Sequence, residues 1–334
     1  GKKIAAQKGT DQEKIAHNEI KDSQVSSLNR LPESILALKS GKVVGTIVEK
    51  PVGEAYLKQN PELEFANVKF NEEKKPTCIA VPKNSPILLK HLNQTIDEVN
   101  NKNLIDKYMN QAAQDMQDDG NFFTKYGSFF IKGIKNTILI SLVGVILGSI
   151  LGAFIALLKI NKFKPLSWLA SIYIEFLRGT PMLVQVFIVF FGTTAALGLD
   201  VSALICGTIA LIINSSAYIA EIIRAGINAV DKGQMEAARS LGLNYIQTMK
   251  SVIMPQAIKN ILPALGNEFV TLIKESSIVS TIGVGEIMFN AQVVQGISFD
   301  PFTPLIVAAV LYFILTFALS RIMSLVEGRM KASD

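Results

Sequence analysis

The sequence predicts two parts in one chain: a small α/β domain, followed by an all-α transmembrane domain of about five helices. The 334 residues are 49% hydrophobic and only 18% charged, whereas a soluble domain usually carries about 25% charge. The apolar residues are also unevenly placed. Residues 1–125 are mixed and rich in lysine, and residues 133–320 hold several apolar runs of membrane-spanning length. We therefore expect one soluble part and one membrane-embedded part.

Strands and helices alternate in the first part. The expected elements are a strand at 2–7, a helix from Gly9–Thr10, a helix at 33–39, a strand at 43–48, a helix near 53–58, a strand at about 77–82, and helices at about 86–99 and 102–113. Such an alternation favours an α/β layer with a largely parallel sheet. Ligands of these sheets bind at the carboxyl ends of the strands.

Thr10 and Glu49 both follow predicted strands directly. Thr10 and Glu13 fit the T-x-x-E pattern of a capping box, and the free amides at a helix start suit a carboxylate ligand. Glu49 would offer its carboxylate to a cation, so the two positions together suit a zwitterion. The alternatives are a plain capped helix at Thr10 and a solvated loop acid at Glu49.

A polar linker is expected after the α/β domain. The sequence QDMQDDG at 114–120 is polar, and we place the connection between the two parts at 116–130. An aromatic run lies within it, at the expected outer surface of the membrane, where aromatic belts occur. Its members are Phe122, Phe123, Tyr126, Phe129 and Phe130. A hydrophobic helix face would explain the same residues.

The second part contains five apolar stretches, at 136–158, about 166–197, about 201–223, about 252–279 and 302–320. The first of them is uncharged and long enough to cross about 30 Å of hydrocarbon as a helix. Glu175 and Arg178 interrupt the second, and the run Arg178-Gly179-Thr180-Pro181 is expected to break it. Such breaks can line a site.

The charges between the stretches predict the orientation in the membrane. Lysines and arginines gather in the 160s, at 224–250 and after residue 320, whereas 195–203 and 279–301 contain none. The positive-inside rule places the basic segments in the cytoplasm. An odd number of spans then places the N-terminal part outside, and the two inferences agree.

The stretch YIAEIIRAGINAVDKGQMEAARSLGLNYIQTMKSVIMPQAIKNILPALGNEF at 218–269 closely resembles the permease signature of ABC importers for polar amino acids. YIEFLRGTPMLVQ at 173–185 is similar to a second segment of these permeases. The residues that resemble the core of their EAA loop are Glu236, Ala237, Ala238, Gly242 and Pro255.

This resemblance implies a transmembrane permease domain at 131–330 with a coupling helix at about 234–246. The coupling helix would dock onto a separate ATP-binding cassette subunit through Glu236, Ala237, Ala238 and Gly242. ATP and Mg are expected on that subunit, because this chain has no G-x-x-x-x-G-K-[ST] loop. We therefore expect no enzyme and no cofactor in this chain, a homodimer of permease chains, and a multi-pass position in the lipid bilayer of the cell membrane.

The first 115 residues resemble the second lobe of a type II periplasmic-type amino-acid-binding protein, with its C-terminal return helices. The cues are GTDQE early and GTIVEKPVGEAYL later. The resemblance implies an extracellular domain at 1–115 with an amino acid as ligand, bound through Thr10 and Glu49. It also implies that the first lobe is missing, so we expect a fragment, because Gly1 is not an initiator methionine and no signal peptide is seen. Fusion of the two domains suggests a Gram-positive bacterium.

Polar residues inside the apolar stretches are costly in lipid and usually pair or face a cavity. Glu221 and Arg224 are expected to pair with each other near the inner surface. Asn267 and Glu268 lie deeper in the fourth stretch. Together with Thr180 they are the candidates for a translocation path.

Other classes of protein fit less well. A ligand-gated channel of the glutamate-receptor type needs a pore filter such as TVGYG, which the sequence lacks, and leaves 218–269 unexplained. A membrane-anchored sensor needs only one or two spans and a cytoplasmic output domain. No nucleic-acid motif, zinc-ligand spacing or catalytic constellation is present in the sequence.

Overall fold

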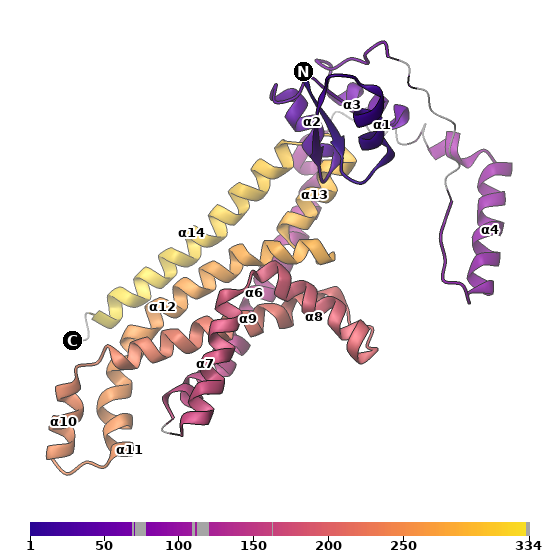
Figure 1. The fold of residues 1–334 in the computed structure, drawn as a ribbon. Coiled ribbons are helices and arrows are strands. Elements are labelled where there is room, and N and C mark those ends of the chain that lie inside the picture. The colour runs from indigo at the N-terminus through magenta and orange to yellow at the C-terminus, as the bar shows by residue number, and fades with distance from the viewer. Residues whose placement is uncertain (69, 71–77, 109–110, 112–119, 162, 332–334) are drawn as a thin grey trace. The chain divides into compact units, whose positions relative to one another are not determined.

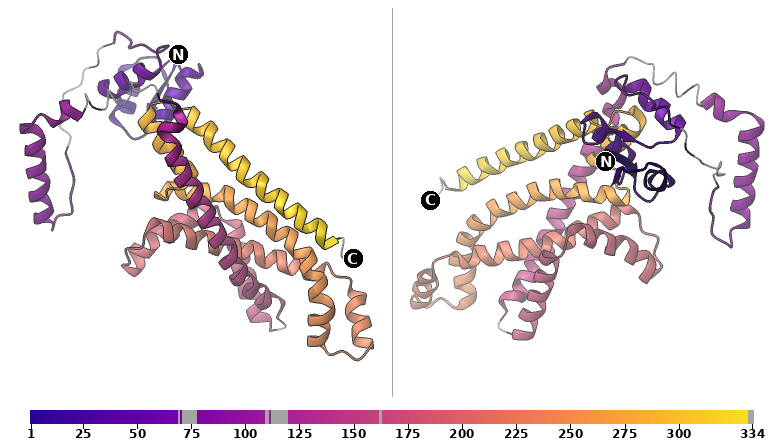
Figure 2. Two further views of the ribbon diagram at one scale, coloured as in Figure 1. Left: turned by 180° about the vertical axis from the view of Figure 1, so that it is seen from behind. Right: turned by 45° about the horizontal axis from the view of Figure 1, so that its top comes forward.

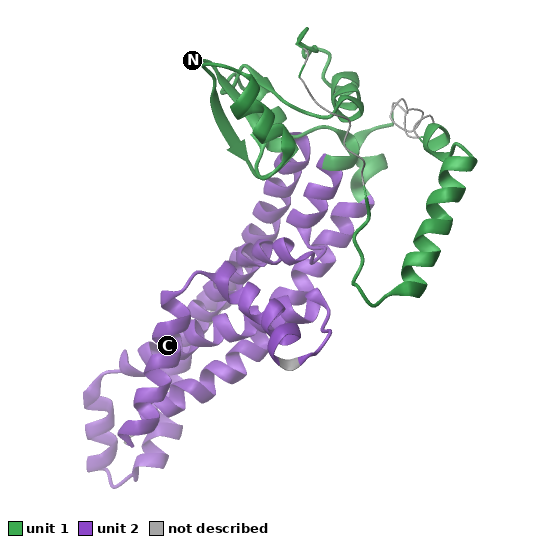
Figure 3. Cartoon of the chain, turned by 45° about the vertical axis from the view of Figure 1, so that its right-hand side comes forward, with its two compact units in different colours: residues 1–127, 296–301 green, residues 128–295, 302–334 purple. Residues whose placement is uncertain are grey.

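The structure is a computed structural model that describes residues 1–68, 70, 78–108, 111, 120–161 and 163–331 (Figure 1). The chain divides into two compact units (Figure 3). Their residues are 1–127 with 296–301 for the first unit, and 128–295 with 302–334 for the second. The segment 296–301, which we expected in the membrane part, thus groups with the first unit.

Three parallel strands form the described sheet of the first unit, in the order β2-β1-β3. The elements are β1 (Lys3–Gln7), α1 (Asp11–Glu19), β2 (Gln24–Leu28), α2 (Leu31–Lys39), β3 (Gly45–Thr46) and α3 (Lys50–Gln59). Ala5 on the central strand pairs with Ser26 on one side and with Thr46 on the other. Its side chain is fully buried. The predicted α/β layer with a parallel sheet is confirmed.

The first unit departs from the predicted strands in three places. β2 is not among the predicted elements, because its sequence QVSSL contains only two apolar residues and lacks an alternating pattern. The predicted strand at 43–48 has only two paired residues, Gly45 and Thr46. Of the predicted strand at 77–82, residue 77 lies outside the described residues, and 78–82 form no strand.

The later helices of this unit are only partly described. α4 (Pro86–Asn101) confirms the helix expected at 86–99, and none of its side chains is buried. Of the helix expected at 102–113, residues 104–108 and 111 are helical, and 109–110 and 112–113 lie outside the described residues. The linker expected from 114 lies outside them as far as residue 119.

Helices make up the described part of the second unit. They are α6 (Phe122–Ile160), which begins in the first unit, α7 (Lys164–Gly179), α8 (Met182–Leu197), α9 (Ala203–Asn228), α10 (Lys232–Ser240), α11 (Tyr245–Thr248), a π-helical turn (Met249–Ile253), α12 (Met254–Glu275), a 3-10 helix (Ser276–Ile282), α13 (Ile287–Ser298) and α14 (Thr303–Lys331).

Three helices in the described residues are long and apolar enough to cross a membrane, namely α6, α9 and α14. Figure 2 shows α6 as one continuous helix. Two more candidates are bent pairs: α7 with α8 at 107°, and the segment Tyr245–Ile282 with α13 at 49°. The unit holds up to five spans if each bent pair is one span, so two of the five predicted helices are broken.

The helix ends in the second unit can be compared with those predicted from the sequence. α7 ends at Gly179 and α8 begins at Met182, which confirms the predicted break at Arg178–Pro181. By contrast, the expected connection at 279–301 contains α13, a helix too short and polar to stand out as a span. Residues 122–130 of the predicted linker at 116–130 are helical and belong to α6.

Glycines allow α6 to approach α9 closely. They recur every fourth residue, at 144, 148 and 152. A Cβ on Gly148 would lie 2.1 Å from the Ser215 Oγ, and one on Gly152 would lie 2.8 Å from the Ser216 carbonyl oxygen. Small residues at this spacing are a common way for membrane helices to pack.

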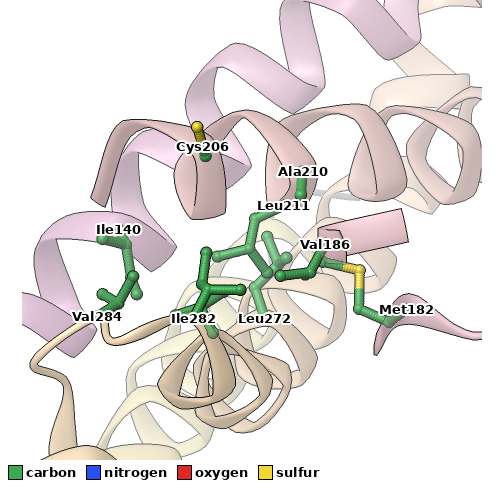
Figure 4. Close-up of a cluster of buried hydrophobic side chains, with 10 residues drawn as sticks. Ile140, Met182, Val186, Cys206, Ala210, Leu211, Leu272, Ile282 and Val284 are labelled. Atoms are coloured by element: carbon green, nitrogen blue, oxygen red, sulfur yellow. The ribbon is translucent and has the colours of Figure 1, made fainter. Parts of the chain in front are cut away.

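The core of the second unit joins α6, α8, α9, α12 and the 3-10 helix (Figure 4). Its buried side chains are Ile140, Met182, Val186, Cys206, Ala210, Leu211, Leu272, Val279, Ile282 and Val284. α8 contributes to this cluster through its first turns, with Met182 and Val186, whereas Ile188 and Phe191 further along the helix are exposed.

Candidate functional site

Thr10 caps the start of α1. Its Oγ1 accepts a hydrogen bond from the Glu13 amide at 3.4 Å and donates one to the Gln7 carbonyl at 2.6 Å. The Glu13 carboxylate accepts from the Ser27 hydroxyl and, at 2.6 Å, from the Gly9 amide, and these two bonds lower the pKa of that carboxyl. In an ideal capping box the Glu13 side chain would accept from the Thr10 amide. Here it accepts from the Gly9 amide instead.

Glu49 lies at the same edge of the sheet as Thr10. It directly precedes α3, is exposed, and makes no capping bond. Since β1 and β3 are parallel neighbours, α1 and α3 begin at the same edge. The Gln12 Nε2 in the first turn of α1 lies 3.5 Å from the Glu49 Oε1. This edge therefore presents an exposed carboxylate beside the start of a helix.

Gln185 closes the break between α7 and α8. Its side chain is only 5% exposed. The Nε2 donates to the Leu177 carbonyl at 2.7 Å, to the Thr180 hydroxyl at 2.8 Å and to the Thr180 carbonyl at 3.1 Å. The Thr180 hydroxyl donates to the Phe176 carbonyl at 2.9 Å. The predicted site residue Thr180 is thus part of the hydrogen bonding that satisfies the broken helix.

Asn214 on α9 continues this network into the interior. Its Nδ2 donates to the Gln185 Oε1 at 2.9 Å. Its Oδ1 is buried and has no hydrogen-bond partner in the described part of the chain, and the same holds for the Ser141 hydroxyl on α6. Buried polar atoms without partners are uncommon. Sequence reasoning missed both residues, because single polar side chains inside uncharged apolar stretches carry little signal.

α9 and α12 lie antiparallel to each other. A Cβ on Gly226 near the end of α9 would lie 2.4 Å from the Ile261 Cγ1 in the first half of α12. A Cβ on Gly144 would lie 3.7 Å from both Leu211, early in α9, and Leu272, late in α12. The residues of α12 between 261 and 272 therefore lie along the middle of α9.

Glu268 falls in this middle part of α12. It is 8% exposed, whereas its neighbour Asn267 is exposed, so the two predicted site residues point in different directions. No hydrogen bond or ion pair joins the Glu268 carboxylate to another residue that the structure describes. Glu275, seven residues later, lies on the same side of the helix. The structure thus places a buried acid without a cation partner in the middle of the helical unit.

The charged residues at the ends of α6 and α9 pair with each other. Arg224 Nε donates to both carboxylate oxygens of Glu221, at 3.0 and 3.1 Å. The Lys159 Nζ lies 3.3 Å from the same carboxylate. The predicted pair of Glu221 and Arg224 is confirmed, and Lys159 extends it.

Two helices, not one, occupy the region of the predicted coupling helix at 234–246. α10 ends at Ser240, and α11 begins at Tyr245. Gly242 between them has φ +87°, a conformation that other L-residues rarely adopt. Asn244 and Gln247 form a capping box at the start of α11, with both bonds at 2.9 Å. Figure 1 shows α10 and α11 side by side at one end of the unit, where α9 ends and α12 begins.

The outer face of this pair is partly apolar. Ala238 packs inward, whereas Glu236 and Ala237 are exposed. Leu241 and Ile246 are 84% and 75% exposed. These two side chains were not predicted, because single apolar residues in a polar stretch give no sign of whether they face the core or a partner. Exposed apolar residues around a fixed turn are suited to docking another protein.

Glu286 is a second buried acid that sequence reasoning missed. It is fully buried at the start of α13. Its carboxylate accepts from the Met288 amide at 2.9 Å, from the Phe289 amide at 2.6 Å and from the Tyr312 hydroxyl of α14. These bonds satisfy the carboxylate, so Glu286 fixes the start of α13 against α14.

Comparison with known proteins identifies the second unit. The family model described as the binding-protein-dependent transport system inner membrane component matches residues 144–332. The chain is 44% identical over 206 residues to the arginine transport system permease protein ArtQ of Bacillus subtilis (strain 168), which covers 62% of this chain and 94% of that protein. It is 42% identical over 205 residues to the putative glutamine transport system permease protein GlnP of Rickettsia bellii (strain RML369-C), covering 61% of this chain and 94% of that protein.

A solved structure agrees with these relatives. The crystal structure of an amino acid ABC transporter with histidines superposes with a TM-score of 0.60 at 48% identity, over 63% of this chain and 99% of that chain. The glutamate-receptor type of channel finds no support in these matches. Because the family model covers more than half of the chain, and the relatives match over nearly their whole length, the chain belongs to the family of binding-protein-dependent transport system inner membrane components.

Proposed function

We propose that this chain is the membrane-spanning permease subunit, fused to a substrate-binding domain, of an ATP-driven importer of polar amino acids. The observation that carries the proposal is the projecting pair of α10 and α11, whose fixed turn at Gly242 bears exposed Leu241 and Ile246. A surface of this kind suits an ATP-binding cassette subunit, which would hold ATP and Mg. The names of the relatives, an arginine and a putative glutamine permease, support the substrate class.

The proposed topology follows from the charges. Lys232 and Arg239 lie on α10, and the basic side of a membrane protein faces the cytoplasm. The chain would then be a multi-pass protein of the bacterial cell membrane, with residues 1–115 outside. Fusion of the two domains favours a Gram-positive source.

The proposed ligand site of the extracellular domain is the edge of the sheet at Thr10 and Glu49. The Glu49 carboxylate would bind the ammonium group of an amino acid, and the amides at the start of α1 would bind its carboxylate. The 3.5 Å contact of Gln12 with Glu49 supports a single site, because it joins the starts of α1 and α3.

The proposed translocation path runs along α12, through Glu268 and Asn267, to the break at Thr180. Glu268 supports the path because it is a buried acid with no cation partner in the described residues, and such residues in membranes usually face polar cavities. Asn267 is exposed on the single chain, as suits a path that a second copy of the chain closes in a homodimer.

ATP-driven uptake tests the proposal. The full chain, assembled with its ATP-binding cassette subunit in vesicles, should accumulate radiolabelled glutamine or arginine only when ATP is present on the side of α10. Ligand-gated ion currents without ATP would instead support a channel. In a Cys78→Ser background, a membrane-impermeant thiol reagent added outside cells should label Ser298→Cys and not Lys232→Cys. The reverse pattern would overturn the topology.

A further inference from the structure

An apolar groove of about 980 Å³ opens where the ends of α6, α9, α11 and α12 meet. This volume lies at the upper end of the range for small-molecule sites, about 300–1,000 Å³. Its lining residues Ile223, Ile227, Met249 and Ile261 belong to one hydrophobic cluster, which also includes the buried Val230, Ile253 and Ala257. The apolar side chains that line the groove include Leu157, Ile160, Ile227, Ile246, Met254 and Ile258. Several of these are more than two-fifths exposed, so the groove is open on one side.

The walls of the groove end beside charged residues of the kind found where hydrocarbon meets the polar surface of a membrane. Its α6 wall ends at Ile160 and Asn161, directly beside Lys159. Its α9 wall, Ile223 and Ile227, flanks Arg224. Apolar residues on one side of these charges and polar residues on the other are typical of a membrane interface. Acyl chains can therefore reach the groove, and head groups can reach its rim.

The rim carries positive charge. Lys250 lines the groove and is exposed. The ion pairs at this end of the unit join Lys159 and Arg224 to the single carboxylate of Glu221, so that trio retains one positive charge, and Lys250 takes no part in it. The π-helical turn Met249–Ile253 holds Lys250 at the rim, and such turns are frequent at functional sites.

We propose that this groove binds one anionic phospholipid, with an acyl chain along the apolar walls and the phosphate at Lys250. A partner protein suits the groove less well, because the surface proposed for the ATP-binding cassette subunit is the outer face of α10 and the turn at Gly242; of that surface, the groove lining includes Ile246 and no residue of α10. The assignment of this lipid to the cytoplasmic leaflet of the membrane rests on the proposed function and its topology. The lipid site itself follows from the groove and its charge.

Native mass spectrometry of the purified full chain tests the site without transport. Detergent-solubilised protein is titrated with phosphatidylglycerol or with phosphatidylcholine of the same acyl chains. We expect one tightly held phosphatidylglycerol per chain and weaker binding of phosphatidylcholine. Lys250→Gln should weaken phosphatidylglycerol binding by about fivefold, the usual effect of one lysine near an anionic membrane surface. Lys250→Arg should keep the binding.

Two further variants separate the site from general effects. Lys164→Gln at the start of α7 removes the same charge from a residue that does not line the groove, and it should bind as the parent does. Ala153→Trp should fill the groove and reduce the binding of both lipids. Equal binding of the two lipids, or equal effects of Lys250→Gln and Lys164→Gln, would overturn the proposal. If Ala153→Trp does not fold, the comparison of Lys250→Gln with Lys164→Gln decides whether the lipid site exists. The topology is tested separately by the thiol labelling, so a failure of one proposal can be told from a failure of the other.

Discussion

Short turns join α7 to α8 and α10 to α11, but the side chains that satisfy their hydrogen bonds come from different places. The first turn is held by residues further along α8 and on α9, and the second by residues next to it in the chain. At the first, the Leu177 and Thr180 carbonyls accept hydrogen bonds from Gln185, which is buried and linked to Asn214 of α9. At the second, Asn244 and Gln247 cap each other within one turn of chain.

This difference reflects the surroundings of each turn. The first turn is tied to the apolar interior through Gln185, which is buried together with Leu177 and Asn214, and each unsatisfied polar group in such surroundings costs free energy. Its partners must therefore come from other helices. The second turn is exposed, so water can satisfy whatever its local caps do not, and Leu241 is free for a partner. A break whose hydrogen bonds reach into the interior thus becomes part of the fold, and one that is capped locally at the surface is suited to docking.

Gln185→Leu should have the largest effect on stability. It removes the donor to the Leu177 and Thr180 carbonyls and leaves the Asn214 amide without its acceptor. Each buried group left unpaired costs about 1–3 kcal/mol, so we expect a loss of roughly 3 kcal/mol or more in the free energy of unfolding. Thermal unfolding of the detergent-solubilised chain measures it.

Gln256→Leu is the matched control for this change. Gln256 is exposed, and its Nε2 donates to the Val252 carbonyl of the preceding π-helical turn at 3.0 Å and to the Gln234 Oε1 of α10 at 3.4 Å. Surface substitutions of this kind usually change stability by less than about 0.5 kcal/mol. Similar losses in the two variants would show that the buried network does not hold the break.

Gly242→Val should affect coupling more than stability. The φ of +87° at Gly242 strains any β-branched residue by roughly 1–2 kcal/mol, and the distortion falls on the exposed turn. We expect amino acid binding to remain and substrate-stimulated ATP hydrolysis to be lost in the assembled complex in reconstituted membranes. Gly242→Asn tolerates a left-handed backbone better and should keep most of the stimulation. Full stimulation in Gly242→Val would mean that the turn is not the mechanical link.

Local chemistry made parts of this arrangement predictable. Pro181 lacks an amide hydrogen, so a break at Thr180–Pro181 follows from the sequence, and a glycine after a polar helix predicts the turn at Gly242. The parallel sheet followed from the alternation of strands and helices. The helices α6, α9 and α14 could be located from the sequence because length and apolar composition alone identify them as spans.

The remaining features depend on contacts between distant parts of the chain. Gln185 is significant only because Leu177, Thr180 and Asn214 surround it, and no short-range pattern brings these residues together. α11 has four residues, little more than one turn of 3.6 residues, and a single turn is too short to show a helical pattern in the sequence. The start of α13 is fixed by Tyr312 through Glu286, which is why the segment was taken for a connection.

Asn244→Ala should have the smallest of these effects, and it tests whether the exposed turn is held locally. The change removes the acceptor of the Gln247 amide. Loss of such a cap typically costs about 1 kcal/mol, less than the loss expected for the buried break. Amide hydrogen exchange should speed up at Gln247 and its neighbours in α11, while exchange in α7 and α8 stays unchanged. Asn244→Ser keeps a capping oxygen and should exchange as the parent does. If exchange rises equally in α8, the two turns are coupled, and the exposed one is not the independent docking element that its local caps indicate.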